Sequence, residues 1–478
     1  MEKSELKAGL EIHQQLDTHK LFCSCPSILR QDKPDYIIHR KLHVVAGESG
    51  EIDIAARHEA EKGIEFEYQG YYDNNCLVEL DEEPPHQINP EALKISIQLA
   101  LLLNCEIIPY TQIMRKTVID GSNVSGFQRT ALIAKNGWLE TSFGKVGIET
   151  VMIEEDAARP SGEENEEKGK SKVYKLDRLG IPLVEVATMP DIKNAEQARE
   201  TALKIGEILR ACKVKRGLGT IRQDINVSIE GHPRVEIKGF QDPKIMIKTV
   251  EIEVQRQKKE LSKKDLKPEV RKTNPNGTTS FLRPMPGSAR MYPETDLPLL
   301  HISRELINEA KRMLPKLRSE VKGELKQKGL SEEMIKLVLQ ENKVNELMEL
   351  LHICDNANLA AKMLVLWPRE IQTKLKLNDK QINERLSVDV LETVLHAVCK
   401  GKINESDIKN TLEKIASGTS IEKALEKEKV ENIEEEILKI VKEKPGLGIN
   451  AYMGLAMSKF KGRVSGKEII EILKRILK

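Results

Sequence analysis

The stretch TIRQDINVSIEGHPRVEIKGF (residues 220–240) decides the fold of the first half of this chain. Apolar Ile225, Val227 and Ile229 alternate with polar residues, and Val235 and Ile237 repeat the alternation after a short Gly/Pro turn. Successive side chains of a strand point to opposite faces, so the two runs predict an antiparallel hairpin with one apolar and one polar face. The apolar face must pack on a core. The polar face is either simply hydrated, as in many antiparallel sheets, or lines a site.

Other segments repeat this pattern. In GLEIHQQLD (residues 9–17), Glu11 and His13 share the polar side of a predicted strand, although a histidine such as His13, taken alone, is more often structural than a ligand. Glu185 interrupts the apolar strand GIPLVEVAT (residues 180–188), where a carboxylate is costly to bury unless it is paired or binds a metal. In VMIEEDAARP (residues 151–160) only one of Glu154 and Glu155 can share a face with its apolar neighbour, and we favour Glu155 as the one facing the cleft.

Four residues from three predicted strands therefore form a candidate metal site: Glu11, His13, Glu155 and Glu185. An oxygen-rich set with one imidazole suits Mg²⁺ or Mn²⁺ better than zinc. Magnesium usually binds together with substrate phosphates, so the pattern indicates ATP chemistry, although the chain has no Walker A motif. The alternative for Glu185 is an ion-paired glutamate at the edge of a sheet.

The organisation of the chain changes near residue 300. The 478 residues are too many for one domain, and short strand-like runs in the first part give way to helical periodicity in the second. We expect an α+β protein: a mostly antiparallel cradle domain (residues 1–298), a helical domain (299–428) and a small helical tail (429–478). The charge-rich stretch 161–172 predicts a mobile surface loop, and 255–272 predicts an exposed helix end and linker.

Bulk composition restricts the function only weakly. Lys and Arg number 76 against 75 Asp and Glu, so an RNA partner would need locally concentrated basic residues. Seven scattered cysteines, without a secretory signal or a long apolar run, predict a cytoplasmic protein with reduced thiols. Cys23 and Cys25 lie close together, but Cys76 and Cys105 are isolated, so we expect free thiols rather than a four-ligand metal site.

Seven motifs occur in order along the chain: GLEIHQQLD, IDGSNVSGFQRT, IEEDAARP, GIPLVEVAT, GTIRQDINVSI, RVEIKGF and ARMYPETDLP. Together they closely resemble the GatE family, a component of archaeal glutamyl-tRNA(Gln) amidotransferases that is related to the bacterial GatB. The resemblance covers nearly the whole chain. It implies an ATP- and Mg²⁺-dependent phosphorylation of the Glu side chain misacylated on tRNA(Gln), followed by amidation with ammonia. Its metal ligands match Glu11, His13, Glu155 and Glu185.

The resemblance also implies looser roles for other residues. Candidates for binding the nucleotide or the aminoacyl end are Ser125, Gln128, Arg129, Arg222, Asp224, Asn226, Glu236 and Lys238. Candidates for lining the substrate cleft are Arg290, Tyr292 and Glu294. Candidates for contacting tRNA phosphates from the tail are Lys459, Lys461, Arg463 and Lys467. The plainer alternatives are a Gly/Ser turn, a Pro-bounded packing loop and a solvated basic helix flank.

Partners follow from the same resemblance. The chain shows no amidase, catalytic-cysteine or asparaginase-type threonine signature, so the asparaginase-like GatD is expected as the ammonia source, in a heterotetramer of two copies of each chain. The inserted domain of many family members, which resembles one in aspartyl-tRNA synthetases, is absent near residues 255–272. Two alternatives are a GatB-type protein that takes ammonia from an amidase and also handles Asp-tRNA(Asn), and a non-catalytic tRNA-binding protein.

Overall fold

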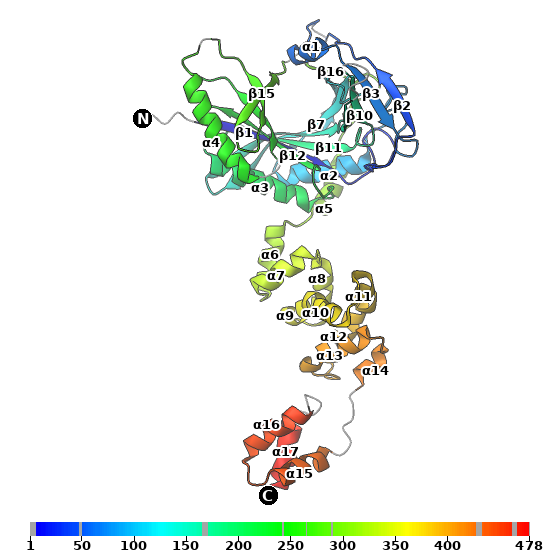
Figure 1. Cartoon of the computed structure of the whole chain (residues 1–478), viewed down its shortest axis with the longest axis vertical. Coiled ribbons are helices and arrows are strands. Elements are labelled where there is room, and N and C mark those ends of the chain that lie inside the picture. Colours follow the sequence, from blue (N-terminus) through cyan, green and yellow to red (C-terminus); the bar gives the residue numbers. More distant parts are fainter. Residues whose placement is uncertain are drawn as a thin grey trace. The chain divides into compact units, whose positions relative to one another are not determined.

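The computed structural model describes residues 6–46, 50–164, 171–240, 243–263, 265–287, 290–426, 433–460 and 466–477. The chain divides into two compact units, Met1–Leu317 and Arg318–Lys478 (Figure 1). Strands and helices share the first unit, whereas the described part of the second is helical, so the predicted α+β class is confirmed. The first unit extends past residue 298 because β17 (Leu300–His301) pairs with β5 (Tyr110–Thr111). In addition, α5 (Arg304–Arg312) packs against α2 (Pro90–Leu102).

A large sheet dominates the first unit, and among the described residues it has eleven strands. Its order is β15 (Thr279–Pro284), β14 (Glu269–Thr273), β13 (Val235–Phe240), β12 (Ile221–Ser228), β1 (Lys7–Gln15), β11 (Pro182–Thr188), β8 (Gly144–Glu155), β7 (Phe127–Thr141), β6 (Met114–Thr117) and β16 (Met291–Pro293). The short β4 (Glu106–Ile107) pairs with β7 outside this path. All these pairs are antiparallel except β13 with β14, which confirms the predicted hairpin and the mostly antiparallel sheet.

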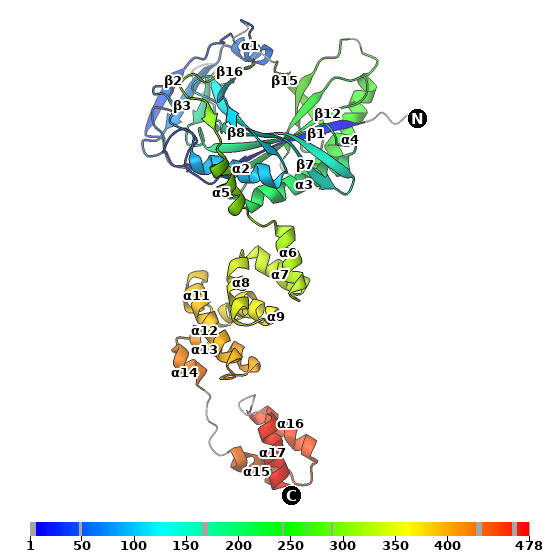
Figure 2. The same ribbon diagram turned by 180° about the vertical axis from the view of Figure 1, so that it is seen from behind.

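Three helices cover the apolar face of this sheet: α2, α3 (Ala195–Ala211) and α4 (Pro243–Glu260), as Figure 2 shows from behind. Leu10, Ile12 and Ile225 of the sheet belong to one buried core with residues of all three helices. Local sequence starts two of these helices, because the side chains of Asn89 and Asn194 accept hydrogen bonds from the first backbone N–H groups of α2 and α3. The helices leave the opposite, polar face of the sheet for the site.

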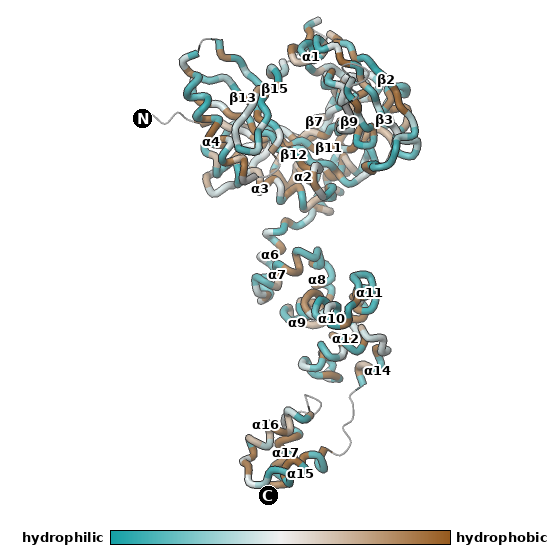
Figure 3. The backbone as a smooth tube through the Cα atoms, in the orientation of Figure 1, coloured by the Kyte–Doolittle hydropathy of each residue, from teal (hydrophilic) through white to brown (hydrophobic). Residues whose placement is uncertain are grey.

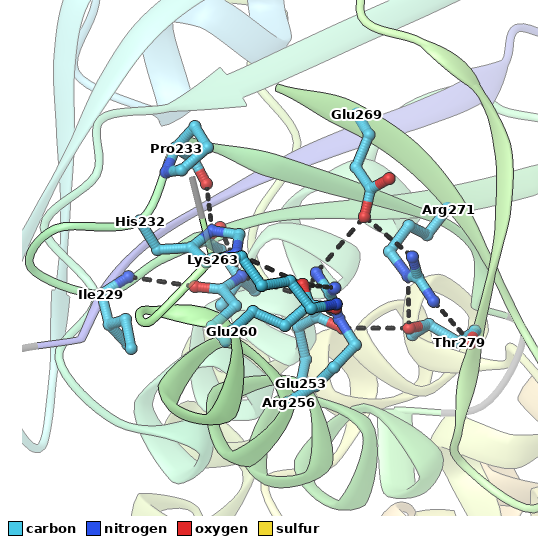
Figure 4. Close-up of polar contacts among 12 residues, drawn as sticks. Ile229, His232, Pro233, Glu253, Arg256, Glu260, Lys263, Glu269, Arg271 and Thr279 are labelled. Atoms are coloured by element: carbon cyan, nitrogen blue, oxygen red, sulfur yellow. Dashed lines mark hydrogen bonds and ion pairs between the residues drawn. The ribbon is translucent and has the colours of Figure 1, made fainter. Parts of the chain in front are cut away.

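A buried polar network fixes α4 beneath β14 and β15 (Figure 4). Glu253 has no exposed surface and accepts bonds from Arg256 Nη2 at 2.7 Å and Thr279 Oγ1 at 2.9 Å. Arg256 also lies 3.4 Å from Glu269, which pairs with Arg271 at 2.8 Å. Since an unpaired buried charge is strongly unfavourable, these ion pairs tie the helix to this end of the sheet.

A second sheet lies in the order β2 (Tyr36–Arg40), β3 (Glu65–Gly70), β10 (Ser171–Lys175) and β9 (Arg159–Glu164), near α1 (Ile54–Ala60). Its aromatic core includes Phe66, Tyr68 and Tyr174. The prediction of a loop over residues 161–172 was therefore wrong at both ends, where strands pair, while residues 165–170 lie outside the described part of the chain. Pairing of β10 with β3 and of β9 with β10 decides these strands, and a charged local composition gives no sign of it.

The second unit is built from short helices. They are α6 (Arg318–Gln327), α7 (Glu332–Gln340), α8 (Val344–Ile353), α9 (Ala357–Ala361), a π-helical turn (Lys362–Leu366), α10 (Trp367–Leu375), α11 (Asp379–Arg385), α12 (Val388–Cys399), a 3₁₀ turn (Glu405–Asp407), α13 (Ile408–Ala416), α14 (Ile421–Leu425), α15 (Ile433–Glu443), α16 (Ile449–Phe460) and α17 (Gly466–Ile476). Residues from Leu325 to Ala424 form one core, and residues from Ile437 to Leu473 form another. Figure 3 shows hydrophobic and hydrophilic stretches alternating along these helices. Among the described residues, no helix has the length and apolar character needed to cross a membrane.

Candidate functional site

Three adjacent strands of the main sheet, β12, β1 and β11, carry six of the predicted site residues (Figure 1): Glu11, His13, Glu185, Arg222, Asp224 and Asn226. His13 of β1 lies opposite Glu185 of β11, and Glu11 of β1 lies opposite Asp224 of β12. Directly opposed side chains of paired strands point to the same face. The structure therefore gathers Glu11, His13 and Glu185 on the polar face, and their role as metal ligands stays a prediction.

One group on this face is the histidine cluster, defined as His13, Glu154 and Glu185. Nε2 of His13 lies 3.0 Å from Oε2 of Glu185, and Lys116 Nζ lies 3.6 Å from the same oxygen. Lys116 also forms an ion pair with Glu154, which accepts a bond from Gln128 Nε2 at 3.1 Å. The possible ligand atoms of the histidine cluster all lie within 4.8 Å of one another, which is close enough for one divalent cation to bridge them.

Protonated His13 and Lys116 balance the negative charge of the carboxylates in the histidine cluster. Burial opposes ionisation of Glu185, but the charge of Lys116 and the hydrogen bond to His13 outweigh burial and lower the pKa of Glu185. Burial also opposes the charged form of His13, but Glu185 outweighs it and raises the pKa of His13. The pKa of Lys116 is raised in the same way, against burial, by Glu154 and Glu185. A bound divalent cation would take over the balancing role of these protonated groups.

The acidic cluster, defined as Glu11, Asp224 and Glu236, lies beside the histidine cluster on the same face. Lys238 Nζ lies 2.7 Å from Oδ2 of Asp224 and also pairs with Glu236. Asn226 Nδ2 donates to Glu11 Oε1 at 2.9 Å. Burial raises the pKa of Glu11, as do the charges of Glu185 and Glu236, so both clusters are coupled electrostatically.

Glu155 does not join either cluster. Alternation along β8 places Glu155 on the same face as buried Ile153, which is the apolar face, and it places Glu154 on the polar face. Glu155 instead accepts a bond from Arg129 N at 3.1 Å, and Arg129 Nη1 lies 3.4 Å from it. Burial raises the pKa of Glu155. The prediction that Glu155 faces the cleft was therefore wrong about its direction, since the face that it shares with Ile153 is the core side.

Glu294 and Arg129 form a buried hub rather than an open cleft wall. Glu294 is fully buried and accepts bonds from Arg115 Nε at 2.9 Å and Arg129 Nε at 2.8 Å. Burial opposes its ionisation, but the hydrogen bonds outweigh burial and lower the pKa of Glu294. The Arg129 guanidinium also lies over the ring of Phe22 at 5.8 Å. This hub holds β16 against β6 and β7, behind the histidine cluster.

The remaining predicted cleft residues make different kinds of contact. Ser125 Oγ donates to the Phe127 carbonyl at 3.0 Å, which supports its plain role in a turn. Arg290 is half-buried and donates to the Thr117 carbonyl at 3.3 Å. Tyr292 packs edge-on against Phe127, with ring centroids 6.3 Å apart.

Arg222 lies at the end of the polar face. Its Nη2 donates to Oδ1 of Asp156 at 2.8 Å, while 42% of the Arg222 side chain remains exposed. Asp156 is buried and also accepts a bond from Gln15 at 2.6 Å. Arg222 is therefore anchored at one side and open to a ligand.

The predicted tRNA-binding residues of the tail are only partly described. Lys459 of α16 forms an ion pair with Glu436 of α15 at 2.6 Å. Lys461 and Arg463 lie outside the described residues, and Lys467 is described only in its backbone, in α17. The tail contacts to tRNA stay a prediction.

Sequence reasoning missed Glu154 of the histidine cluster and Lys116, which pairs with two of its carboxylates. It favoured Glu155 over Glu154, although counting the alternation from Ile153 would have selected Glu154. Lys116 belongs to a four-residue strand whose polar composition, MRKT, gives little periodicity. Only pairing with β7, which places Lys116 opposite Gln128, shows where it lies.

The chain is similar to known proteins along its whole length. A family model described as the GatB/GatE catalytic domain matches residues 6–308. The chain is 37% identical to the GatE subunit of the glutamyl-tRNA(Gln) amidotransferase of Methanocaldococcus jannaschii, over 100% of the chain and 99% of that relative. It is 34% identical to the corresponding subunit of Archaeoglobus fulgidus, over 100% and 98%. It is also 34% identical to that of Methanothermobacter thermautotrophicus, over 86% of each chain.

These relatives are longer than this chain. The alignment with the M. jannaschii protein extends over 636 positions, whereas this chain has 478 residues, so that relative contains insertions without a counterpart here. The position of the missing insert near residues 255–272 stays a prediction.

Proposed function

The chain belongs to the GatB/GatE family, and on that premise we propose that it works as the GatE subunit of a glutamyl-tRNA(Gln) amidotransferase. In this reaction a γ-carboxylate oxygen of Glu on tRNA(Gln) attacks the γ-phosphorus of ATP, and ADP leaves. Ammonia then attacks the carbonyl carbon of the acyl phosphate and expels phosphate, giving Gln-tRNA(Gln). A carboxylate is a poor electrophile without such a leaving group, so phosphorylation must come before amidation. Both steps act on the same carboxyl group, and we therefore assign them to one site.

The observation that carries this proposal is the pair of clusters on one face of the sheet. The histidine cluster and Glu11 offer carboxylates and one imidazole, a donor set that fits Mg²⁺ or Mn²⁺. When bound, the metal would neutralise charge on the phosphate oxygens. The resemblance assigns a ligand role to Glu155, but the geometry favours Glu154 in its place.

Cationic side chains of this chain would bind the phosphates directly. Lys116 pairs with carboxylates of the histidine cluster, and Lys238 pairs with carboxylates of the acidic cluster. Metal binding to these carboxylates would free the two ammonium groups for phosphate oxygens. Arg290 lies close enough to Glu154 and Glu236 for their charges to affect its pKa, which burial lowers. These three cations surround the surface on which the triphosphate is proposed to lie.

Ammonium chloride as the nitrogen donor allows the full chain to be tested without its ammonia-producing partner. ADP release and Gln-tRNA(Gln) formation are measured with ATP, Mg²⁺ and Glu-tRNA(Gln). Glu154→Gln and Glu185→Gln should each lower both rates by at least about 100-fold, because each removes charge where the phosphoryl group is held. Glu83→Gln, an exposed carboxylate paired with His86, should leave both rates unchanged.

The outcome also separates the competing assignments. Unchanged rates in Glu154→Gln and Glu185→Gln would rule out the metal site, and no ATP turnover by the wild type would favour a non-catalytic tRNA-binding protein. Mn²⁺ binding that is lost in Glu155→Gln but kept in Glu154→Gln would support the resemblance over the geometry. Thermal unfolding of the Glu155→Gln variant controls for its buried contact with Arg129.

The proposed partner is the asparaginase-like GatD, in a heterotetramer with two copies of each chain. Support comes from the absence of an ammonia-producing signature in the sequence and from the similarity to archaeal GatE proteins along the whole chain. The rival is an amidase partner of the kind expected for a GatB-type protein. Affinity purification of the tagged chain from its host, with identification of bound proteins, should yield an asparaginase-like protein. Recovery of an amidase-like protein, with activity on Asp-tRNA(Asn), would favour the rival.

A further inference from the structure

Two arginines beside the carboxylate clusters lack an ionic partner, and we call them the arginine pair. Arg283 lies in β15 and Arg290 directly precedes β16, at opposite ends of the strand order of the main sheet. Both side chains are half-buried, and no carboxylate among the described residues forms an ion pair with either of them. Since a partly buried charge is unfavourable without a counter-charge, the arginine pair is suited to an anion that the chain itself does not supply.

A β-bulge turns Arg283 toward the polar face of the sheet. Thr279 of β15 donates to Glu253 of α4, so Thr279 lies on the face that the helices cover. By regular alternation Arg283, four residues later, would share that face. The register shifts between β14 and β15, however, and Arg283 lies opposite Val270, which lies opposite Glu236 of the acidic cluster. Opposed residues point to the same face, so the bulge places Arg283 on the face of the clusters.

The two members of the arginine pair lie within electrostatic range of each other. Burial lowers the pKa of Arg290, and the positive charge of Arg283 lowers it further. The charges of Glu154, Asp53 and Glu236 act in the opposite direction. An anion between two guanidinium groups would remove their mutual repulsion, and the planar fork of arginine matches the oxygens of a phosphate group.

Asp53 fixes the chain between the two arginines. Its side chain is buried at the start of α1, where Oδ2 accepts a bond from the Ala56 N–H at 3.0 Å. Oδ1 accepts a bond from the Gly287 N–H at 2.8 Å, and α1 contacts β15. One carboxylate therefore ties α1 to the segment that joins β15 to β16 and carries the arginine pair.

We propose that Arg283 and Arg290 bind one phosphate group of the nucleotide between them, and that Asp53 is the residue that positions them. This inference rests on the function proposed above, and it adds Arg283 to the cations assigned to the triphosphate. The two carboxylate clusters lie on central strands, whereas the arginine pair comes from the two ends of the strand order. Bound nucleotide would thus connect both edges of the sheet with its centre.

The test is nucleotide binding by the full chain, which needs neither tRNA nor turnover. Affinity for the fluorescent analogue MANT-ATP is measured with Mg²⁺, and inorganic triphosphate serves as a competitor. Arg283→Met should raise both dissociation constants by the same factor, at least about tenfold, because the contact is to phosphate rather than to the base. Arg283→Lys keeps the charge without the fork and should raise them by about threefold. Arg234→Met, at an exposed position of the same unit, is the matched control and should change neither.

Asp53→Ser separates positioning from folding. Serine still caps α1, so stability against urea should stay near wild type, but its side chain is too short to reach Gly287 as well. We expect affinity for MANT-ATP to fall by about threefold to tenfold. In a background of Arg283→Met and Arg290→Met the same substitution should have no further effect, because Asp53 acts through these arginines. An equal loss in that background would overturn the positioning role.

Three outcomes would count against the arginine pair. Unchanged affinity in Arg283→Met, or a wild type that binds neither MANT-ATP nor triphosphate, would overturn the proposal. A loss of affinity only for an RNA oligonucleotide ending in CCA would assign the arginine pair to an RNA phosphodiester instead of the nucleotide. By contrast, nucleotide binding that depends on Arg283, in a wild type without turnover on Glu-tRNA(Gln), would refute the function proposed above and support the arginine pair.

Discussion

At the scale of single residues, Glu294 should give the clearest pH dependence. Its folded pKa lies below its ordinary value of 4.5, against burial, because Arg115 and Arg129 stabilise the carboxylate. The unfolded chain therefore binds the proton more readily. Stabilisation by Glu294 is present above about pH 4.5 and is lost as the pH falls through the folded pKa. Glu294→Gln should lower the free energy of unfolding of the first unit by about 3–5 kcal/mol at pH 7, because buried Arg129 and partly buried Arg115 lose a fully buried carboxylate partner.

The chain's two tryptophans make this measurement specific. Trp138 belongs to the first unit and Trp367 to the second, so urea unfolding followed by fluorescence in a Trp367→Phe background reports the first unit alone. Below the folded pKa the wild type and Glu294→Gln should converge. A difference that stays constant from pH 7 into the acid range would mean that the charge of Glu294 is not what stabilises the hub.

Lys116 should compete with the metal. Its ammonium lies between Glu154 and Glu185, where a divalent ion is proposed to bind. We expect Lys116→Met to strengthen Mn²⁺ binding, measured by electron paramagnetic resonance, by about tenfold, or about 1.4 kcal/mol. The same change should lower ATP turnover by about 100-fold, because a cation is lost from the proposed phosphate site. Lys116→Arg retains the charge and should stay near wild type in Mn²⁺ affinity. Weaker Mn²⁺ binding in Lys116→Met would contradict the competition.

At the scale of elements, Arg256 tests how α4 is held to the sheet. Arg256→Met leaves Glu253 buried with only neutral donors, so the first unit should lose about 3 kcal/mol of unfolding free energy. The measurement is again Trp138 fluorescence in urea. Lys258→Met, at an exposed position of the same helix, should change stability by less than about 0.5 kcal/mol. Equal effects of both substitutions would show that the ion pairs contribute nothing beyond helix propensity.

Sequence periodicity predicted those elements that bury one face by themselves. The hairpin of β12 and β13 followed from alternation because Ile225 and Ile237 are fully buried and register is fixed by burial. The helical periodicity expected after about residue 300 was right, but it did not show the break between α7 and α8. There, Asn342 adopts a left-handed conformation with φ of 56°. Strands held mainly by pairing, such as β9 and β10, show no local periodicity from which they could be predicted.

At the scale of the whole molecule, the candidate site depends on contacts that no local pattern encodes. β1 lies between β11 and β12, which follow it by more than 150 residues. Glu11, His13 and Glu185 could be grouped from their patterns and from the family resemblance. Lys116, Glu154 and the closeness of Cys76 to Cys23 and Cys25 needed the actual strand order and turns, since their partners come from separate parts of the chain. Local sequence patterns therefore predict single strands, but they do not show which distant strands lie side by side.

The proposed binding of tRNA would have to depend on local charge, because the net charge of the chain is only +1. Lys459 in the tail is exposed but is paired with Glu436 at 2.6 Å, so the predicted phosphate contact would replace an ion pair. Lys459→Ala should weaken tRNA binding and reduce the slope of log K against log salt by about 0.9. Glu436→Gln should strengthen binding, because it frees the ammonium. Filter binding over a salt series measures both variants, with exposed Lys380→Ala as the control. An unchanged slope in Lys459→Ala would place the tRNA contact elsewhere, since a lysine that neutralises a phosphate must release a counterion when it binds.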